Sequence, residues 1–393
     1  MRKKLIAVLL IATLAVATIG CGSDTQRTST GTVANASAGG EKTEVETISS
    51  EARTLAEELL TRNVTEKDVV TEEVVEATIQ VLKETYEFEN LNELRVNDDE
   101  SSLIADRKGW YNKLYNDSGI KVVVAEGSSK HQLESLESGE INIAWRMWDP
   151  VIAYLAHGAE LTIVNVSEHP LEEISQAIVL KDSGITEFSQ LKGKRISTSR
   201  TTCSYYTLNE MADEEGWTEN VDYEFVNVAD TEAKSALIAG EIDGLVMHQN
   251  PSVNNLLLDG TAVVLRNAVA DGIYVNKGGG RHVVYGLTDW IGSHKNVVKV
   301  FVKLNQVIKA YILQNLDESA ALYEDISRVP AKNTIYWLEC EKNNWYFTEE
   351  PLESISKDSA DLLEYSKSIG DAPADAQIDF DAVLDEEFFN QGQ

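Results

Sequence analysis

Cationic and hydroxyl side chains gather at Arg200-Thr201-Thr202-Cys203-Ser204, between a predicted strand at 195–197 and a predicted helix at 205–211. Free N–H groups at a helix N-terminus, together with Thr and Ser hydroxyls, make a ready site for an oxyanion. A guanidinium adds a bidentate contact to a sulfonate, carboxylate or phosphate. Ordinary helix capping would use the same groups and is the alternative. The residues that we expect to bind an anion here are Arg200, Thr201, Thr202 and Ser204.

The segment Gly127-Ser128-Ser129-Lys130 repeats this arrangement after a predicted strand at 120–124. We expect Ser128 and Ser129 to give a second anion contact, with a capped loop as the alternative. The three carboxylates at 98–100 oppose both assignments, because they follow another predicted strand and would repel an anion. They would instead attract an amine or a quaternary ammonium, or lie in solvent.

The segment Trp145-Arg146-Met147-Trp148-Asp149-Pro150 combines aromatic, cationic and acidic groups. Indoles line pockets and stack on apolar or cationic parts of a ligand. Arg146 is expected to pair either with an anion or with Asp149 in the same loop. The alternative is that one indole belongs to the core and Arg146 is structural. The residues that we expect to bind a ligand here are Trp145, Arg146, Trp148 and Asp149.

This loop belongs to a half-repeat formed by residues 132–150 and 233–251. Each copy reads as a helix, a Gly, a buried strand and a loop that closes on Pro, and a Gly after a helix accommodates the left-handed cap. The repeat predicts two similar lobes that each present one loop to a shared cleft. In the second copy the loop brings His248, which we expect to contact the ligand; a satisfied hydrogen-bonding role is the alternative.

Short β-type runs alternate with helical patterns from residue 94 onward. This alternation is typical of the α/β class with parallel sheets. In such sheets ligands bind beyond the carboxyl ends of the strands, where the loops above are placed. The predicted strands are 94–96, 120–124, 141–145, 161–164, 177–180, 195–197, 223–226, 244–247, 262–265 and 272–275.

The N-terminal part divides into three segments. Residues 1–20 run from basic through apolar to small residues, the order of an export signal, and Cys21 follows directly. A Cys in this place resembles the lipobox of bacterial lipoproteins, which implies cleavage before Cys21 and its lipidation. The alternative is a membrane-spanning anchor, but the apolar run is shorter than the roughly 20 residues that crossing a membrane requires. Residues 21–43, rich in Ser, Thr, Gly and Ala, predict a flexible tether. Residues 44–92 predict two amphipathic helices, with Thr71 as the N-cap of the second.

Composition and motifs exclude several classes of function. A net charge of −31 argues against nucleic-acid binding, and 393 residues with 43% hydrophobic content can bury one large core or two lobes. The six histidines show no metal-ligand spacing, and neither a Gly-x-Ser-x-Gly elbow nor a P-loop is present. We therefore expect no metal, no cofactor and no enzymatic activity, and we expect Cys203 and Cys340 to be thiols. The rival is a Cys-dependent hydrolase or transferase in which Cys203 pairs with His248.

Four segments in this order resemble a known family: 136–144, 183–196, 236–244, and a helix at 297–313 that leads to 317–320. They look like the substrate-binding proteins of ABC importers for aliphatic sulfonates, taurine and nitrate, whose fold is shared by the binders of thiamine pyrimidine precursors. The resemblance covers about residues 94–393. It implies a type II periplasmic-binding-protein fold, with two α/β lobes around a hinge and a ligand cleft. Lobe one would comprise 93–178 and 274–393, lobe two 179–273, and 44–92 a helical extension.

The resemblance also implies a function. The chain would be a lipid-anchored, monomeric receptor on the outer side of the cell membrane, which captures a small anionic organic solute and delivers it to an ABC permease and its ATPase. One alternative is a binder of a thiamine pyrimidine precursor or another amine-bearing solute. A ligand sensor on the same fold is a further alternative.

Overall fold

The computed structural model describes residues 48–125, 131–170, 175–200, 202–273 and 279–389. Residues 47–393 form one compact unit. The predictions for 1–43, including lipidation of Cys21, and those for Ser128, Ser129 and Thr201 lie outside the described residues. In the described part, no helix is both long and apolar enough to cross a membrane.

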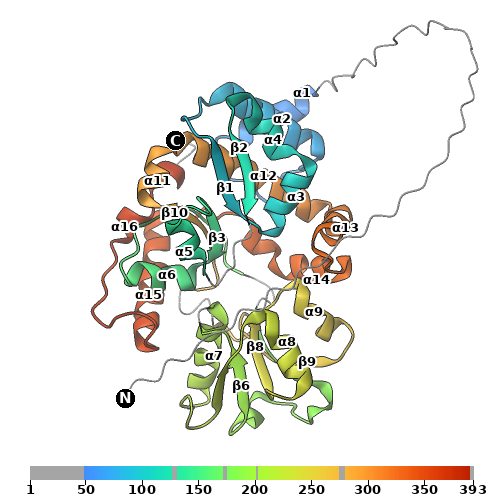
Figure 1. Cartoon of the computed structure of the whole chain (residues 1–393), viewed down its shortest axis with the longest axis vertical. Helices are drawn as coiled ribbons and strands as arrows, with labels where there is room; N and C mark the ends of the chain where they lie inside the picture. Colours follow the sequence, from blue (N-terminus) through green and yellow to red (C-terminus); the bar gives the residue numbers. More distant parts are fainter. Residues whose placement is uncertain (1–47, 126–130, 171–174, 201, 274–278, 390–393) are drawn as a thin grey trace, which may run out of the picture. The chain divides into compact units, whose positions relative to one another are not determined.

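The first lobe contains a sheet in two connected parts (Figure 1). Strands β1 (Glu93–Asn97) and β2 (Lys121–Ala125) pair in parallel. Strand β10 (His282–Leu287) lies between β3 (Ala144–Met147) and β4 (Leu161–Val166), antiparallel to both. A bridge between Val96 and Ile143 joins the two parts.

The predicted N-terminal extension packs into this lobe. Its helices are α1 (Ser50–Leu59) and α2 (Glu72–Thr85), and the Thr71 side chain accepts a hydrogen bond from the Val74 N–H, which confirms the predicted cap. Their apolar residues share one core with α12 (Lys295–Gln314). Because α12 is buried along nearly its whole length, the extension supplies the surface that covers it.

The second lobe is a five-stranded sheet in the order β7-β6-β8-β5-β9. Helices cover both of its faces, with α7 on one side of the sheet and α8 on the other in Figure 1. Its strands are β5 (Ser175–Leu180), β6 (Arg195–Thr198), β7 (Glu224–Asn227), β8 (Gly244–His248) and β9 (Ala262–Asn267). Its main helices are α7 (Cys203–Glu214), α8 (Asp230–Ala239) and α9 (Pro251–Leu258).

The remaining elements lie mostly in the C-terminal half. Helix α14 packs against α9 of the second lobe as well as α13, although the sequence assigns all of 274–393 to lobe one. These elements are α3 (Glu100–Lys108), α4 (Trp110–Tyr115), α5 (Gln132–Glu137), α6 (Trp148–Ala156), α11 (Thr288–Ser293), α13 (Leu316–Ser327), α14 (Ala331–Glu341), α15 (Leu352–Ser368), α16 (Phe380–Val383) and α17 (Glu386–Phe389), with 3-10 turns at Asn116–Ser118, Lys181–Ser183, Phe188–Leu191 and Lys342–Trp345.

The predicted α/β class is confirmed, but three details of the prediction are wrong. Both sheets are mixed rather than parallel, because β5 and β10 are the first strands after the chain crosses between lobes, and each enters its new sheet antiparallel. The second sheet begins at Ser175 and not at 179, since Ser175 already pairs with His248. The strand predicted at 272–275 is absent from its described residues, where Gly272 lies in a turn with φ 71°; the strand that follows is β10.

Candidate functional site

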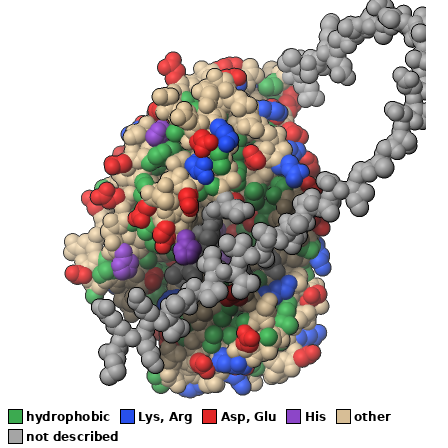
Figure 2. All heavy atoms as spheres, in the orientation of Figure 1, with side chains coloured by type: hydrophobic (Ala, Val, Ile, Leu, Met, Phe, Trp, Pro, Cys, Tyr) green, Lys and Arg blue, Asp and Glu red, His purple; other side chains and the backbone are tan. Residues whose placement is uncertain are grey.

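A cavity of about 240 Å³ lies where the two lobes meet, and the visible face is hollowed there (Figure 2). Both half-repeats end at this cavity. The first, α5–β3–α6, supplies Trp145, Arg146, Met147 and Pro150 to its wall, and the second, α8–β8–α9, supplies His248 to Pro251. Gly139 and Gly240 end the two repeat helices with φ of 75° and 69°, values that a residue with a side chain rarely adopts. The repeat thus aims two equivalent strand ends at one cavity.

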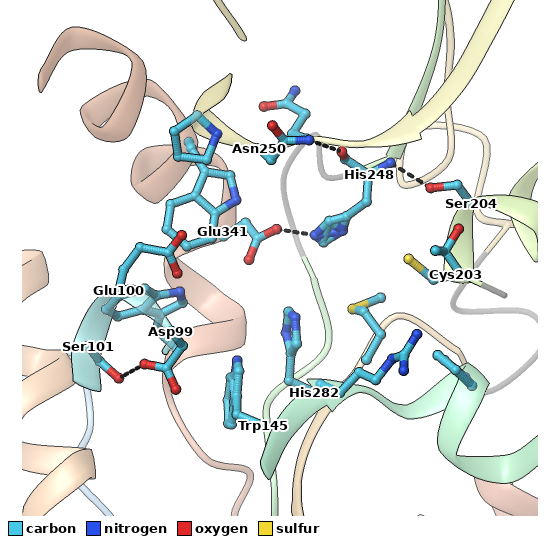
Figure 3. A pocket seen from close by; sticks show the side chains of 18 of the residues that line it. Asp99, Glu100, Ser101, Trp145, Cys203, Ser204, His248, Asn250, His282 and Glu341 are labelled. Carbon is cyan, nitrogen blue, oxygen red and sulfur yellow. Dashed lines mark hydrogen bonds and ion pairs between the residues drawn. The ribbon is translucent and has the colours of Figure 1, made fainter. Parts of the chain in front are cut away.

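Two histidines and a glutamate face one another inside the cavity (Figure 3). His248 at the end of β8 forms a hydrogen bond through Nε2 to Glu341 Oε1 at the end of α14. The His282 ring, at the start of β10, stands 5.9 Å from that of His248. Burial lowers the pKa of His248 to about 4 and the pKa of His282 well below its usual range, while it raises the pKa of Glu341 well above its usual range. Burial therefore favours the neutral forms of both imidazoles and of the Glu341 carboxyl group.

Carboxylates from the start of α3 form the next part of the wall. Asp99 caps the helix by accepting hydrogen bonds from the Ser101 hydroxyl and the Ser102 N–H. Burial, reinforced by the charges of Asp99 and Asp98, raises the pKa of Glu100 to about 7. Asp99 and Glu100 of the 98–100 segment thus line the cavity. The sequence alone leaves open whether these carboxylates face a ligand or lie in solvent.

A buried lysine balances this acidic wall. Lys309 of α12 is 3% exposed, and its Nζ lies over the Trp145 ring. Burial lowers the pKa of Lys309 to about 7, against the opposing charges of Asp99, Glu100 and Glu341. Trp337 and Trp345 complete the aromatic part of the wall. Glu100 and Lys309 both change charge near pH 7, so the charge of the cavity depends on its occupant.

The predicted residues of the 145–150 loop have different positions. Trp145 lines the cavity and stacks on His282 with ring centroids 4.9 Å apart. Arg146 also lines the cavity, where its guanidinium donates to the Tyr154 hydroxyl. Trp148 is instead fully buried in the core, and its indole N–H donates to Ser359 Oγ. Asp149 is buried behind the wall, and burial raises its pKa to about 7. Trp148 and Asp149 point away because α6 begins at Trp148 and turns both toward the core.

The predicted anion loop is only partly at the cavity. Thr202, Cys203 and Ser204 line it, and Ser204 Oγ accepts a hydrogen bond from the His248 N–H. Thr202 donates to the Ser199 carbonyl. The Arg200 guanidinium lies elsewhere: it bonds Glu219 Oε1 at 2.6 Å and the Tyr205 hydroxyl, and it stacks against Phe225. The bidentate anion contact expected of Arg200 is therefore occupied by Glu219.

Several wall residues carry no signal in the sequence. His282, Lys309, Trp337 and Glu341 come from β10, α12 and α14, far from the loops that follow the predicted strands. Lys309 alone gives a hint, since it interrupts the apolar face of a long helix. Cys203 and Cys340 are thiols as expected. The His248 imidazole, which the hydrolase alternative pairs with Cys203, forms its hydrogen bond with Glu341 instead.

Comparisons with known proteins identify a family for the chain and relatives of its fold. A profile described as "NMT1/THI5 like" matches residues 100–318. A Bacillus subtilis (strain 168) protein whose name refers to the binding of aliphatic sulfonates is 26% identical over 314 residues, which cover 78% of this chain and 89% of that protein. The crystal structure of the periplasmic aliphatic sulphonate binding protein SsuA from Escherichia coli superposes with a TM-score of 0.62 at 18% identity, covering 74% of this chain and 92% of SsuA. The desulfurization enzyme DSZB shares the fold with a TM-score of 0.54 at 13% identity, covering 77% of this chain and 98% of DSZB.

These matches confirm the predicted periplasmic-binding-protein fold and the predicted resemblance to substrate-binding proteins of ABC importers. The profile spans more than half of the chain and includes β2 to β10, the two half-repeats and most of the cavity wall. The chain belongs to the NMT1/THI5-like family.

Proposed function

We propose that the protein is the extracytoplasmic solute-binding component of an ABC importer, held at the membrane by a lipid on Cys21. It acts as a monomer, closes its two lobes on a small organic solute, and delivers that solute to a permease and its ATPase. The support is a cavity whose wall takes residues from both lobes, because only such a site couples binding to closure.

The solute of this importer carries an amine or another cationic group. The observation that carries this assignment is the position of Glu100 in the wall, next to Asp99 and near the indoles of Trp145 and Trp337. Aromatic faces and carboxylates together bind ammonium groups. The guanidinium expected to bind an anion, that of Arg200, is engaged by Glu219 instead. The amine-bearing alternative drawn from the sequence therefore takes precedence over the sulfonate.

An anionic solute remains the second candidate, favoured by Arg146 and Lys309 in the wall and by the name of the Bacillus subtilis relative. Proton linkage separates the two. A cation stabilises ionised Glu100, whose pKa is about 7, so its binding releases a proton and its affinity rises with pH. An anion stabilises protonated Lys309, whose pKa is also about 7, so its affinity falls as pH rises.

Calorimetry with probes that do not titrate tests this assignment. Choline and alkanesulfonates keep their charge between pH 5.5 and 8, and a panel of alkylamines, aminopyrimidines, taurine and nitrate extends the search. We expect the tightest ligand to be cationic, with an affinity that rises about tenfold per pH unit below pH 7. Glu100→Gln should remove this dependence. A tightest ligand that is a sulfonate and weakens with rising pH would refute the cationic assignment and leave the importer role intact.

The lipid anchor has a separate test. Cells that express the full chain are labelled with an alkyne analogue of palmitate, and we expect the label on the wild type and not on Cys21→Ala. The variant should appear in the soluble extracytoplasmic fraction. Label on both proteins would refute lipidation at Cys21.

A further inference from the structure

The cleft holds a set of three side chains with the chemistry of a transition-metal site. His248, His282 and Glu341 each offer one ligand atom, and these atoms all lie within 4.8 Å of one another. His248 comes from β8 in one lobe, His282 from β10 in the other, and Glu341 from α14. Glu341 is 1% exposed and His282 is 7% exposed. Polar side chains this deeply buried are normally committed to a partner or to an ion.

The surroundings fix the orientation of these side chains before any ligand arrives. The His282 ring stacks on Trp145 with an angle of 10° between the planes, and its Nδ1 lies 3.3 Å from the Asn344 amide nitrogen. The His248 backbone N–H donates to Ser204 at 2.7 Å, which holds the end of β8 in place. Supporting contacts of this kind orient imidazole ligands in metal sites.

The distances suit a divalent first-row ion. Two ligands bound tetrahedrally to zinc are about 3.3 Å apart, given metal–ligand distances of about 2.0–2.1 Å. The ligand atoms of the present set lie within 4.8 Å of one another, so binding of the ion must shorten these separations by up to about 1.5 Å. Two imidazoles and one carboxylate favour zinc and its neighbours over magnesium or calcium, which prefer oxygen ligands.

A second cluster of metal-ligand residue types in the same protein already has a cationic partner. His169, Glu350 and Asp358 also lie within ligand distance of one another. There the fully buried Arg281 donates to Glu350 at 2.8 Å and to Asp358 at 3.3 Å, so a guanidinium already occupies the centre of the carboxylates. In the cleft, Glu341 interacts with His248 and the Trp337 side chain, and no guanidinium is among its described partners. The wall adds the carboxyl groups of Asp99 and Glu100 as well as the amine of Lys309.

We propose that His248, His282 and Glu341 bind one divalent transition-metal ion, of the zinc class, in the cleft. Three protein ligands leave a fourth position open to the cavity, where a donor atom of the solute or a water completes the coordination. Because the ligands come from both lobes, the ion stabilises the closed form. This site stands beside the proposed function and does not depend on it, since the metal alone is the ligand.

Cobalt and zinc titrations of the full chain in detergent, stripped of metal with a chelator and free of solute, test the site. We expect one Co²⁺ per chain with the visible absorption of a four- or five-coordinate ion, displaced by one Zn²⁺. His282→Gln and Glu341→Gln should each weaken Co²⁺ binding by about 100-fold or more. His169→Gln is the matched control from the Arg281-containing cluster and should bind Co²⁺ as the wild type does.

A measurement on the wild type keeps the test independent of how well the variants fold. Histidine labelled with ¹⁵N should show two imidazoles whose nitrogen shifts change on addition of one equivalent of Zn²⁺. Absence of a cobalt spectrum, unchanged imidazole shifts, or folded cleft variants with wild-type affinity would each overturn the metal site. Calorimetry of the metal-free protein with choline and sulfonates judges the proposed function separately from these results.

Discussion

The two histidine–carboxylate clusters of this protein contain the same residue types and have opposite characters. In the cluster of His169, Glu350 and Asp358, Arg281 lies among the carboxylates. In the cleft, Glu341 faces His248 and His282. Burial alone would raise the pKa of Glu350, but the hydrogen bonds from Arg281 and Ser354 and the charge of Arg281 together lower it, whereas burial raises the pKa of Glu341.

This difference separates a structural cluster from a binding one. The guanidinium of Arg281 also donates to the Ser167 carbonyl, in the segment that leads from β4 toward the second lobe. Arg281 itself directly precedes β10, so it ties together the two strand connections near the lobe boundary. Among the described residues, no guanidinium bonds the cleft cluster, and burial favours the neutral forms of its two imidazoles and its carboxyl group. A group kept neutral by burial is ready to take up charge when a cationic partner arrives.

The largest expected effect is the removal of the guanidinium. Arg281→Met leaves Glu350 and Asp358 close together without their cation. Because both carboxylates are partly exposed, we expect a loss of about 3 kcal/mol of unfolding free energy, the lower end of the range for breaking a buried pair. Urea unfolding at pH 7 measures it. Glu341→Gln is the matched control and should change the unfolding free energy by less than about 1 kcal/mol, because the amide mimics the protonated carboxyl. Equal losses in both variants would contradict the distinction between the clusters.

A smaller effect is expected when one carboxylate of the structural cluster is neutralised. Glu350→Gln keeps the shape of the side chain but removes its negative charge. The hydrogen bonds that Arg281 and Ser354 donate to this side chain are then no longer charge-assisted. We expect a loss of about 2 kcal/mol, less than for Arg281→Met because Asp358 still compensates the guanidinium. The same urea titration checks it, and a loss below that of Glu341→Gln would show that Arg281 does not need Glu350.

The sequence predicts the frame of the cleft because the frame depends on local patterns. The half-repeat places residues 145–150 and 248–251 at equivalent strand ends, and both segments supply side chains to the cavity wall. Thr71 caps α2 as its spacing indicates. These features follow from residues close together in the chain, where periodicity and caps are decisive.

The chemistry inside the cleft depends on contacts that no local pattern records. Glu341 reaches His248 across 93 residues of sequence, and Lys309 enters from a helix whose pattern indicates only a buried face. Arg200 is a residue for which the local pattern misleads: its place in the sequence suits an anion contact, but its guanidinium donates to Glu219 and Tyr205. Trp145 lies within β3 and lines the cavity wall, whereas Trp148 is the first residue of α6 and lies in the core. The sequence does not reveal where the strand ends and the helix begins.

The smallest predicted effect is a difference in pH dependence between the two regions. Glu100 has its pKa raised to about 7 in the folded protein, so the folded state holds a proton that the unfolded state has released above pH 4.5. Stability from this group is therefore lost as pH rises from about 5 to 7. The lowered pKa of Glu350 acts in the opposite sense and only at acid pH, where stability is lost as that carboxylate is protonated.

Glu100→Gln isolates the contribution of the cleft. The difference in unfolding free energy between variant and wild type should grow in favour of the variant by about 1–2 kcal/mol between pH 5 and pH 8, a figure that allows for solvent screening at the wall. Denaturant titrations of the ligand-free protein at both pH values measure it, and Glu350→Gln should show no such growth over this range. A constant difference for Glu100→Gln would mean that Glu100 is already ionised at pH 5, and the cleft would then be permanently acidic rather than charged by its ligand.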